Sequence, residues 1–165
     1  MTDSTAPGRP PKARSRTTAR VAAVQALFQC EQAGETAETV ADQFTRHRLG
    51  GTSTEDIDEG QMPDADFRLF GMIVRGTTVA QDRIDAELSG ALPEAWPLHR
   101  LDPVLRALLR AAVFEFGSDT PPRVVINEYL DVAHGFFSGD EPKLVNGVLD
   151  ALAKARALQT PDTDD

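Results

Sequence analysis

The sequence has one cysteine, Cys30, in 165 residues. A single thiol excludes an internal disulfide, and such a chain is typical of a reducing compartment. No apolar run approaches the roughly 18 residues that a membrane-spanning helix needs, and the N-terminus has no apolar segment of a secretory signal. We therefore expect a cytoplasmic protein, with Cys30 at a buried helix position rather than acting as a reactive thiol.

Motifs of catalysis and cofactor binding are also missing. His47, His99 and His134 lie far apart, without cysteine or histidine neighbours at metal-ligand spacing. Neither of the glycine-rich phosphate loops, GxxxxGK[ST] and GxGxxG, occurs, and GxSxG and HExxH are absent. These absences argue against an enzyme and predict no cofactor and no metal.

The residues that are present suit a small globular protein with an uneven charge distribution. Apolar residues make up 41% and aromatic residues 6%, so the core is expected to consist mainly of aliphatic side chains. Residues 1–20 carry five basic groups and one acidic group, a formal charge of +4, whereas the other 145 residues carry 12 basic and 25 acidic groups, a charge of −13. A basic arm on an acidic body favours a polyanionic partner such as nucleic acid, and a solvated tail without a partner is the equal alternative.

The segment 103–116 predicts the central helix of the protein. It is apolar around nearly its whole circumference, which is typical of a helix surrounded by other elements. Asp102 can cap its first turn, and Pro103 suits the first helical position. Gly117 follows the last apolar residue, where a left-handed helix end is common.

Apolar spacing of three and four residues predicts further helices on both sides of this one. The predicted fold class is all-α, a bundle of six to seven helices in two subdomains. The flanking helices are expected over about 17–33, 37–48, 64–88, 94–98 (short), 123–137 and 142–158. The domain plan is a flexible basic arm (1–16), one helical domain (17–158, with bundles of about 17–88 and 94–158), a mobile loop at 49–63 and a loose acidic tail (159–165).

Several single residues invite a functional reading but are more simply explained by packing. We expect Trp96 to pack over the end of the central helix, and Asn127 and Asn146 to be buried amides that tie helices together. Gly76 and Gly147 interrupt helices, which is costly unless another element approaches closely.

The start of the last predicted helix is a candidate binding surface. Backbone N–H groups at Asp140–Lys143 could receive a phosphate, to which Lys143 adds a charge. Phe136 and Phe137 lie just before it and could stack on an unpaired base. Two core phenylalanines beside a solvated loop are the alternative.

Blocks of sequence across the chain support a specific resemblance. They are WPLHRLDPV (96–104), LLR (108–110), FE (114–115), PPRVVINE (121–128) and VNGVLD (145–150), with Arg20 and AVQALF (23–28) near the N-terminus. In these blocks the chain resembles the NusB family of bacterial transcription antitermination factors, over about residues 16–154. The INE and VNGVLD blocks behind the RLDPV helix are highly specific when they occur together.

The resemblance implies an all-helical fold of two bundles and no catalysis. It implies binding to the boxA element of ribosomal RNA operon transcripts, as a heterodimer with the small-subunit ribosomal protein NusE. The wider complex would contain NusA, NusG and RNA polymerase, and its product would be processive transcription. The alternatives are a NusB-like RNA-binding module related to that of ribosomal RNA cytosine methyltransferases, or a protein-interaction module without RNA binding.

The resemblance also implies site residues. RNA contacts are expected from the basic N-terminus and from the loop before the last helix, at Arg14, Arg16, Arg20, Gln25, Phe136, Asp140, Lys143 and Leu144. Partner contacts are expected at Phe28, Leu105, Arg106 and Arg110. Leu144 replaces a phenylalanine that is usual in the family, and a leucine cannot stack on a base. Leu105 replaces a usual acidic residue on the expected partner-facing surface, where Arg106 could supply a contact instead.

Overall fold

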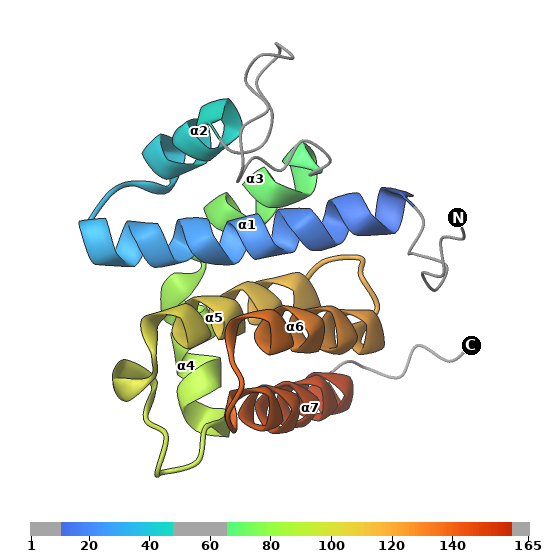
Figure 1. Ribbon diagram of the computed structural model, residues 1–165. Helices are drawn as coiled ribbons and strands as arrows, with labels where there is room; N and C mark the ends of the chain where they lie inside the picture. Colours follow the sequence, from blue (N-terminus) through green and yellow to red (C-terminus); the bar gives the residue numbers. More distant parts are fainter. Residues whose placement is uncertain (1–10, 48–65, 160–165) are drawn as a thin grey trace.

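The computed structural model describes residues 11–47 and 66–159, and every regular element in these ranges is helical (Figure 1). The all-helical class is thereby confirmed. The first ten residues of the expected arm, the expected loop at 49–63 and residues 160–165 of the expected tail lie outside the described ranges. The elements are α1 (Pro11–Ala33), α2 (Ala37–His47), α3 (Phe67–Val79), α4 (Gln81–Ala91), the 3-10 helix η2 (Leu98–Arg100), α5 (Pro103–Phe116), α6 (Pro122–Phe136) and α7 (Glu141–Gln159).

The predicted central helix, α5, packs against α1, α3, α4, α6 and α7. One Asp102 carboxylate oxygen accepts hydrogen bonds from the N–H groups of Val104 (2.8 Å) and Leu105 (3.3 Å), which confirms the cap. Gly117 does not adopt the expected left-handed conformation, because its φ is −87°. Instead its N–H donates to the Phe114 carbonyl at 3.0 Å and closes a tight final turn.

The first helix, α1, joins the two bundles. It crosses the molecule with α2 and α3 on one side and α5 and α6 on the other (Figure 1). Its buried face is rich in alanine, and small side chains allow neighbouring helices to approach closely. The helix begins at Pro11, so the last six residues of the predicted flexible arm are helical. The Ser15 carbonyl accepts a 3.0 Å hydrogen bond from the Asp66 N–H, which ties this early part of α1 to the start of α3.

The predicted long helix over 64–88 is divided at Ala80, whose φ of −96° and ψ of 12° end α3. The residues before the break, Thr77 to Val79, are all β-branched, and the Thr78 hydroxyl donates to the Val74 carbonyl at 2.9 Å. Both features weaken a helix. After this break α4 packs against α5 and α7.

Glycines and amides in the helices have different roles from those expected. A Cβ at Gly76 would lie 2.1 Å from the Phe114 ring, so close approach is confirmed there. At Gly147 nothing lies within 4 Å of such a Cβ, so the prediction of close packing is wrong. Asn127 and Asn146 are exposed, so neither is a buried amide.

Candidate nucleic-acid and protein interfaces

The N-terminal half of α1 carries two accessible arginines. Arg14 is exposed, and Arg16 is half-buried beside the start of α6. A hollow of about 350 Å³ opens there, the Arg16 hollow, lined by Arg16, Arg20, Asp119, Thr120, Pro121, Val124 and Glu128. Arg14 and Arg16 are therefore the cations of α1 that remain available to a polyanion among the described side chains.

Arg20 is not available in this way, which corrects its prediction as an RNA contact. Its side chain is 4% exposed. Its Nε and Nη2 donate to the two carboxylate oxygens of Glu115 at 2.7 and 2.9 Å. The Tyr129 hydroxyl donates to the same carboxylate at 2.5 Å, and Glu128 lies 3.4 Å from the guanidinium. A guanidinium held in this way cannot reach a phosphate without leaving a buried carboxylate unpaired.

Arg20, Glu115 and Tyr129, here called the buried cluster, connect α1, α5 and α6. Burial lowers the pKa of Arg20, but the hydrogen bonds and charge of Glu115 outweigh it and leave that pKa raised. Burial, followed by the charge of Glu115, raises the pKa of Tyr129 well above 10.0. The Arg20 guanidinium therefore stays charged and the Tyr129 phenol stays neutral across the neutral range.

The second expected RNA surface lies at the start of α7. Asp140 and Lys143 are exposed, and Leu144 is half-buried. Phe136 and Phe137 are also half-buried against the core, with ring centroids 6.3 Å apart and planes tilted by 51°. Neither ring is a fully exposed platform, and neither is completely enclosed.

A hollow of about 510 Å³ adjoins this surface, the Trp96 hollow. It is lined by Ala91, Pro93, Trp96, Asp140, Lys143, Leu144, Gly147 and Val148. Trp96 is 37% exposed, so the prediction that it packs over the central helix is wrong. The reason is local: the short helix begins only at Leu98, which leaves Trp96 in an irregular segment facing α7.

The predicted RNA residues thus form two groups at opposite ends of α6. The start of α1 lies beside the start of α6, whereas α7 starts beyond the C-terminal end of α6 (Figure 1). No described contact joins the two groups. One RNA strand would have to extend along the molecule to touch both.

Gln25 belongs to neither of these groups. It lines a hollow of about 410 Å³ between α1 and α2, the Phe28 hollow, together with Phe28, Gln29, Gln32, Ala33 and Phe44. The Gln25 Oε1 is buried and has no hydrogen-bond partner within the described structure. The three-residue spacing of Gln25 and Phe28 already places them on one helical face, which associates Gln25 with the expected partner surface.

On α5, the expected partner residues have different environments. Leu105 is 1% exposed, so the prediction that it faces a partner is wrong. It lies three and four residues before the buried Leu108 and Leu109 and therefore shares their inward face. Arg106 and Arg110 are 12% exposed and can be reached from outside.

The partly exposed cluster consists of Arg106 and Arg110 together with the carboxylates of Glu31 and Asp85. Arg106 forms a close ion pair with Glu31 of α1, and its Nη1 donates to the Leu98 and Leu101 carbonyls at 3.1 and 3.0 Å. Arg110 donates to Asp85 of α4 at 2.8 and 2.9 Å and to Glu31 at 2.7 Å.

Neighbouring groups in the partly exposed cluster favour the charged forms of Glu31 and Arg110. Hydrogen bonds from Arg106, followed by those from Arg110, lower the pKa of Glu31 despite some burial. Burial opposes the charge of Arg110, but Asp85 and Glu31 outweigh it and raise the Arg110 pKa. The family resemblance pointed to the two arginines, but the sequence carried no comparable signal for Glu31 and Asp85.

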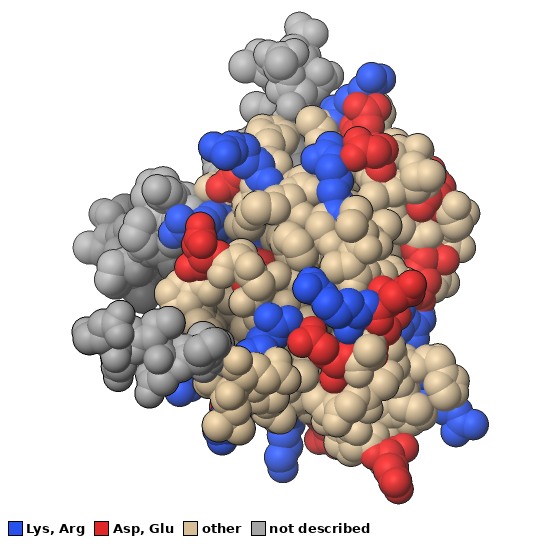
Figure 2. All heavy atoms as spheres, turned by 180° about the vertical axis from the view of Figure 1, so that it is seen from behind, with Lys and Arg blue, Asp and Glu red and all other residues tan. Residues whose placement is uncertain are grey.

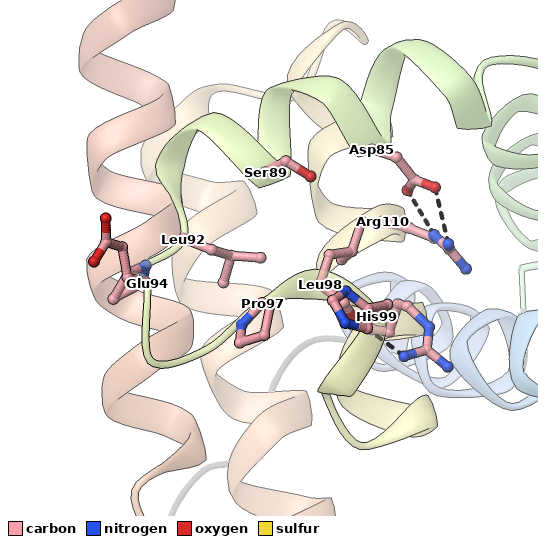
Figure 3. A pocket seen from close by; sticks show the side chains of 10 residues that line it. Asp85, Ser89, Leu92, Glu94, Pro97, Leu98, His99 and Arg110 are labelled. Atoms are coloured by element: carbon pink, nitrogen blue, oxygen red, sulfur yellow. Dashed lines mark hydrogen bonds and ion pairs between the residues drawn. The ribbon is translucent and has the colours of Figure 1, made fainter.

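A hollow of about 580 Å³, the Arg106 hollow, opens beside this cluster (Figure 3). Figure 3 shows Asp85 and Ser89 projecting from α4, and Leu92 just after its end, on the side of the segment that carries Pro97, Leu98 and His99. The apolar residues that line the Arg106 hollow and the paired charges beside it suit a protein segment with both apolar and polar groups.

The surface charges are mixed. Figure 2 shows Lys and Arg side chains interspersed with Asp and Glu on the face opposite to that of Figure 1. In residues 11–47 and 66–159 no group of three or more His, Cys, Asp or Glu side chains is arranged to hold a metal ion. None of the helices in those ranges is both long enough and apolar enough to cross a membrane.

Comparison with solved structures supports the fold. The chain is similar to NusB of T. maritima, with a TM-score of 0.66 and 27% identity over 93% of this chain and all of that one. It shares its fold with the structure of the antitermination factors NusB and NusE in complex with dsRNA, with a TM-score of 0.66 and 24% identity over 86% of this chain and 98% of that one.

Comparison with known sequences settles the family. The chain is 69% identical to the transcription antitermination protein NusB of Gluconobacter oxydans, over 93% of this chain and 96% of the relative. It is 59% identical to the protein of the same name from Granulibacter bethesdensis, over 87% and 90%. The NusB family model matches residues 17–154. The chain therefore belongs to the NusB family.

Proposed function

We propose that this protein is a transcription antitermination factor that binds boxA-type RNA of ribosomal RNA operon transcripts together with the ribosomal protein NusE. The observation that carries the proposal is the family match over residues 17–154, supported by relatives that are named for transcription antitermination. The factor works by binding, without catalysis, in the cytoplasm where transcripts are made. NusA, NusG and RNA polymerase complete the wider complex.

The RNA follows a path between the two accessible groups of residues. Arg14 and Arg16 contact phosphates at the start of α1, and Lys143 contacts another at the start of α7. Phosphate contacts position a strand and make its affinity depend on salt, whereas bases supply the sequence preference. The two groups face different ends of α6, so the RNA is bound in an extended, single-stranded form.

NusE binds the side of the molecule where α1, α4 and α5 meet. Phe28 supplies a half-buried aromatic anchor, and Arg106 and Arg110 supply guanidinium groups with fixed geometry. Aromatic residues and arginine are the side chains that most often dominate binding energy at interfaces. The related structure of NusB and NusE with dsRNA shows that this fold can carry both kinds of partner at once.

The proposal is tested by measuring RNA binding and antitermination with the purified protein, NusE and RNA polymerase. Binding of labelled single-stranded boxA-type RNA is followed by fluorescence anisotropy at several salt concentrations. Replacing Arg14 and Arg16 together by alanine is expected to reduce the salt slope by about 0.7 for each lost phosphate contact. The matched control replaces Arg46 and Arg75, which are exposed on α2 and α3.

Three outcomes are possible, and each leads to a different conclusion. A smaller slope in the Arg14 and Arg16 variant, with the control unchanged, supports RNA binding through α1. Equal slopes in all three proteins would restrict RNA binding to other surfaces. If the wild-type protein neither binds boxA-type RNA nor increases read-through of a terminator, the proposed function is wrong, and the interaction-module alternative is favoured.

A further inference from the structure

The Trp96 hollow is one of the four surface hollows described above, and it is the one that a tryptophan lines. It lies between the end of α4, the irregular segment around Trp96 and one face of α7. Its volume of about 510 Å³ falls in the range of ligand-binding clefts.

Gly147 keeps the floor of this hollow open. A glycine inside a helix costs about 1 kcal/mol relative to alanine. Elsewhere, at Gly76, that cost allows the Phe114 ring to approach, whereas at Gly147 no heavy atom lies within 4 Å of an added Cβ. Gly147 is itself exposed, so a molecule from outside can reach the space beside it.

Trp96 forms the opposite wall and is itself partly uncovered. Among the described aromatic residues Phe67 and Trp96 are the exposed ones, at 43% and 37%, and Phe67 lines none of the four hollows. A partly exposed indole offers a large apolar ring on which a planar base can stack. The chain has one tryptophan in all, and it is this one.

The rim carries the two charged groups that a nucleotide needs. Lys143 is exposed and can pair with a phosphate, and Asp140, one turn earlier, can accept hydrogen bonds from the N–H groups of a base edge. A membrane lipid or an acidic peptide would use the lysine but would have no use for the carboxylate or the flat indole face.

We propose that the Trp96 hollow receives one unpaired base of the bound RNA, which stacks on the Trp96 indole above Gly147, with its phosphate beside Lys143. This inference rests on the proposed RNA-binding function and adds the residue that reads a single nucleotide. It assigns the aromatic contact to Trp96 rather than to Phe136 or Phe137, which are both packed against the core.

The single tryptophan allows direct observation of this contact. Single-stranded boxA-type RNA is titrated into the wild-type protein, with and without NusE. Tryptophan fluorescence is recorded together with the anisotropy of a label on the RNA. Stacking predicts that fluorescence is quenched over the same concentration range in which anisotropy rises. A series of RNAs, each with one abasic position, should restore the fluorescence at a single position only.

Variants then test whether the hollow contributes to affinity. Trp96→Leu is expected to weaken binding roughly 5- to 150-fold, the range that corresponds to loss of one stacked base, whereas Trp96→Phe should retain much of the affinity. Gly147→Leu fills the hollow and should weaken binding to a similar extent. Gly90→Leu is the matched control, because Gly90 is also a helical glycine with nothing within 4 Å and lines no described hollow.

The outcomes distinguish the two proposals. If the RNA binds but fluorescence is unchanged and Gly147→Leu binds as Gly90→Leu does, the base is not in this hollow, and the proposed function stands without it. If the wild-type protein binds no boxA-type RNA by anisotropy, the proposed function fails and this inference falls with it. Quenching that is reversed by one abasic position and abolished by Gly147→Leu would establish the site.

Discussion

Two clusters of arginines and carboxylates hold α1 against α5, and they differ in how far water can reach them. In the buried cluster the side chains of Arg20 and Glu115 are 4% and 1% exposed. In the partly exposed cluster Arg110 is 12% exposed and Glu31 29%. Because α1 and α5 run antiparallel, the first cluster joins the N-terminal half of α1 to the end of α5, and the second joins the end of α1 to the start of α5.

The difference in burial separates a structural role from a binding role. A charge left without its partner in the interior cannot be solvated, so every member of the buried cluster depends on the others. A charge left alone near the surface is hydrated and costs little. The buried cluster is therefore expected to determine the stability of the fold, and the partly exposed cluster to remain free to exchange its contacts for those of a partner.

The largest effect is expected when the buried cluster loses its anion. Glu115→Gln leaves the buried Arg20 guanidinium with Glu128, 3.4 Å away, as its remaining charged partner, which should lower the free energy of unfolding by about 3 kcal/mol. Urea unfolding followed by circular dichroism measures it. The double variant Arg20→Met with Glu115→Leu, which removes both charges, should recover much of the loss. A change below about 1 kcal/mol in Glu115→Gln would show that the cluster is not structural.

The next effect concerns Tyr129, the only tyrosine of the chain. Tyr129→Phe removes the hydrogen bond to the Glu115 carboxylate and is expected to cost about 1.5–3 kcal/mol at neutral pH. Because the folded pKa of Tyr129 is raised, its contribution is complete below pH 10.0 and is lost as the pH rises through the folded value. Tyrosinate absorbance in the wild-type protein should therefore appear together with unfolding. Its appearance in a protein that is still folded would contradict the burial of Tyr129.

The next prediction concerns Arg110, which belongs to the partly exposed cluster. Arg110→Ala removes contacts to Asp85 and Glu31, and we expect roughly tenfold weaker binding to NusE, or ~1.4 kcal/mol. The free energy of unfolding should change by about 1 kcal/mol or less, because the remaining carboxylates are hydrated. Calorimetric titration and urea unfolding provide the two readouts. Arg75→Ala, which breaks an exposed ion pair to Glu38, is the control. A loss of stability without a loss of affinity would assign Arg110 to the fold.

The sequence predicted those features whose causes are local. The central helix could be placed from Asp102, Pro103 and its apolar circumference, because capping and burial on all sides act within a few residues. Capping of the same local kind begins two other helices, where the Thr39 N–H donates to the Thr36 hydroxyl at 3.2 Å and the Leu69 N–H to the Asp66 carboxylate at 3.0 Å.

The sequence could not predict features that depend on distant partners. Arg20 counted as part of a basic arm because Glu115, which neutralises it, is 95 residues away. Leu105, by contrast, could have been placed correctly from its spacing to Leu108 and Leu109. The open space at Gly147 was not predictable either, because a glycine in a helix looks the same whether a neighbour fills the space or not.

The smallest effect on stability is expected at Glu31, and it is detected through the pH dependence of the free energy of unfolding. Its pKa is lowered from 4.5 in the folded protein by hydrogen bonds from Arg106 and Arg110. A lowered folded pKa stabilises the protein above the unfolded value, and this contribution is lost as the pH falls through the folded value. Glu31→Gln should therefore be less stable than wild type at pH 7, by less than about 1 kcal/mol because the side chain is partly solvated. The difference should shrink below pH 4.5, as measured by urea unfolding at a series of pH values. The control is Asp42→Asn, which breaks an exposed pair within α2 and should show almost no difference at any pH. If the Glu31→Gln difference persists unchanged in acid, the carboxylate acts through packing rather than charge, and the two clusters differ less than their exposure indicates.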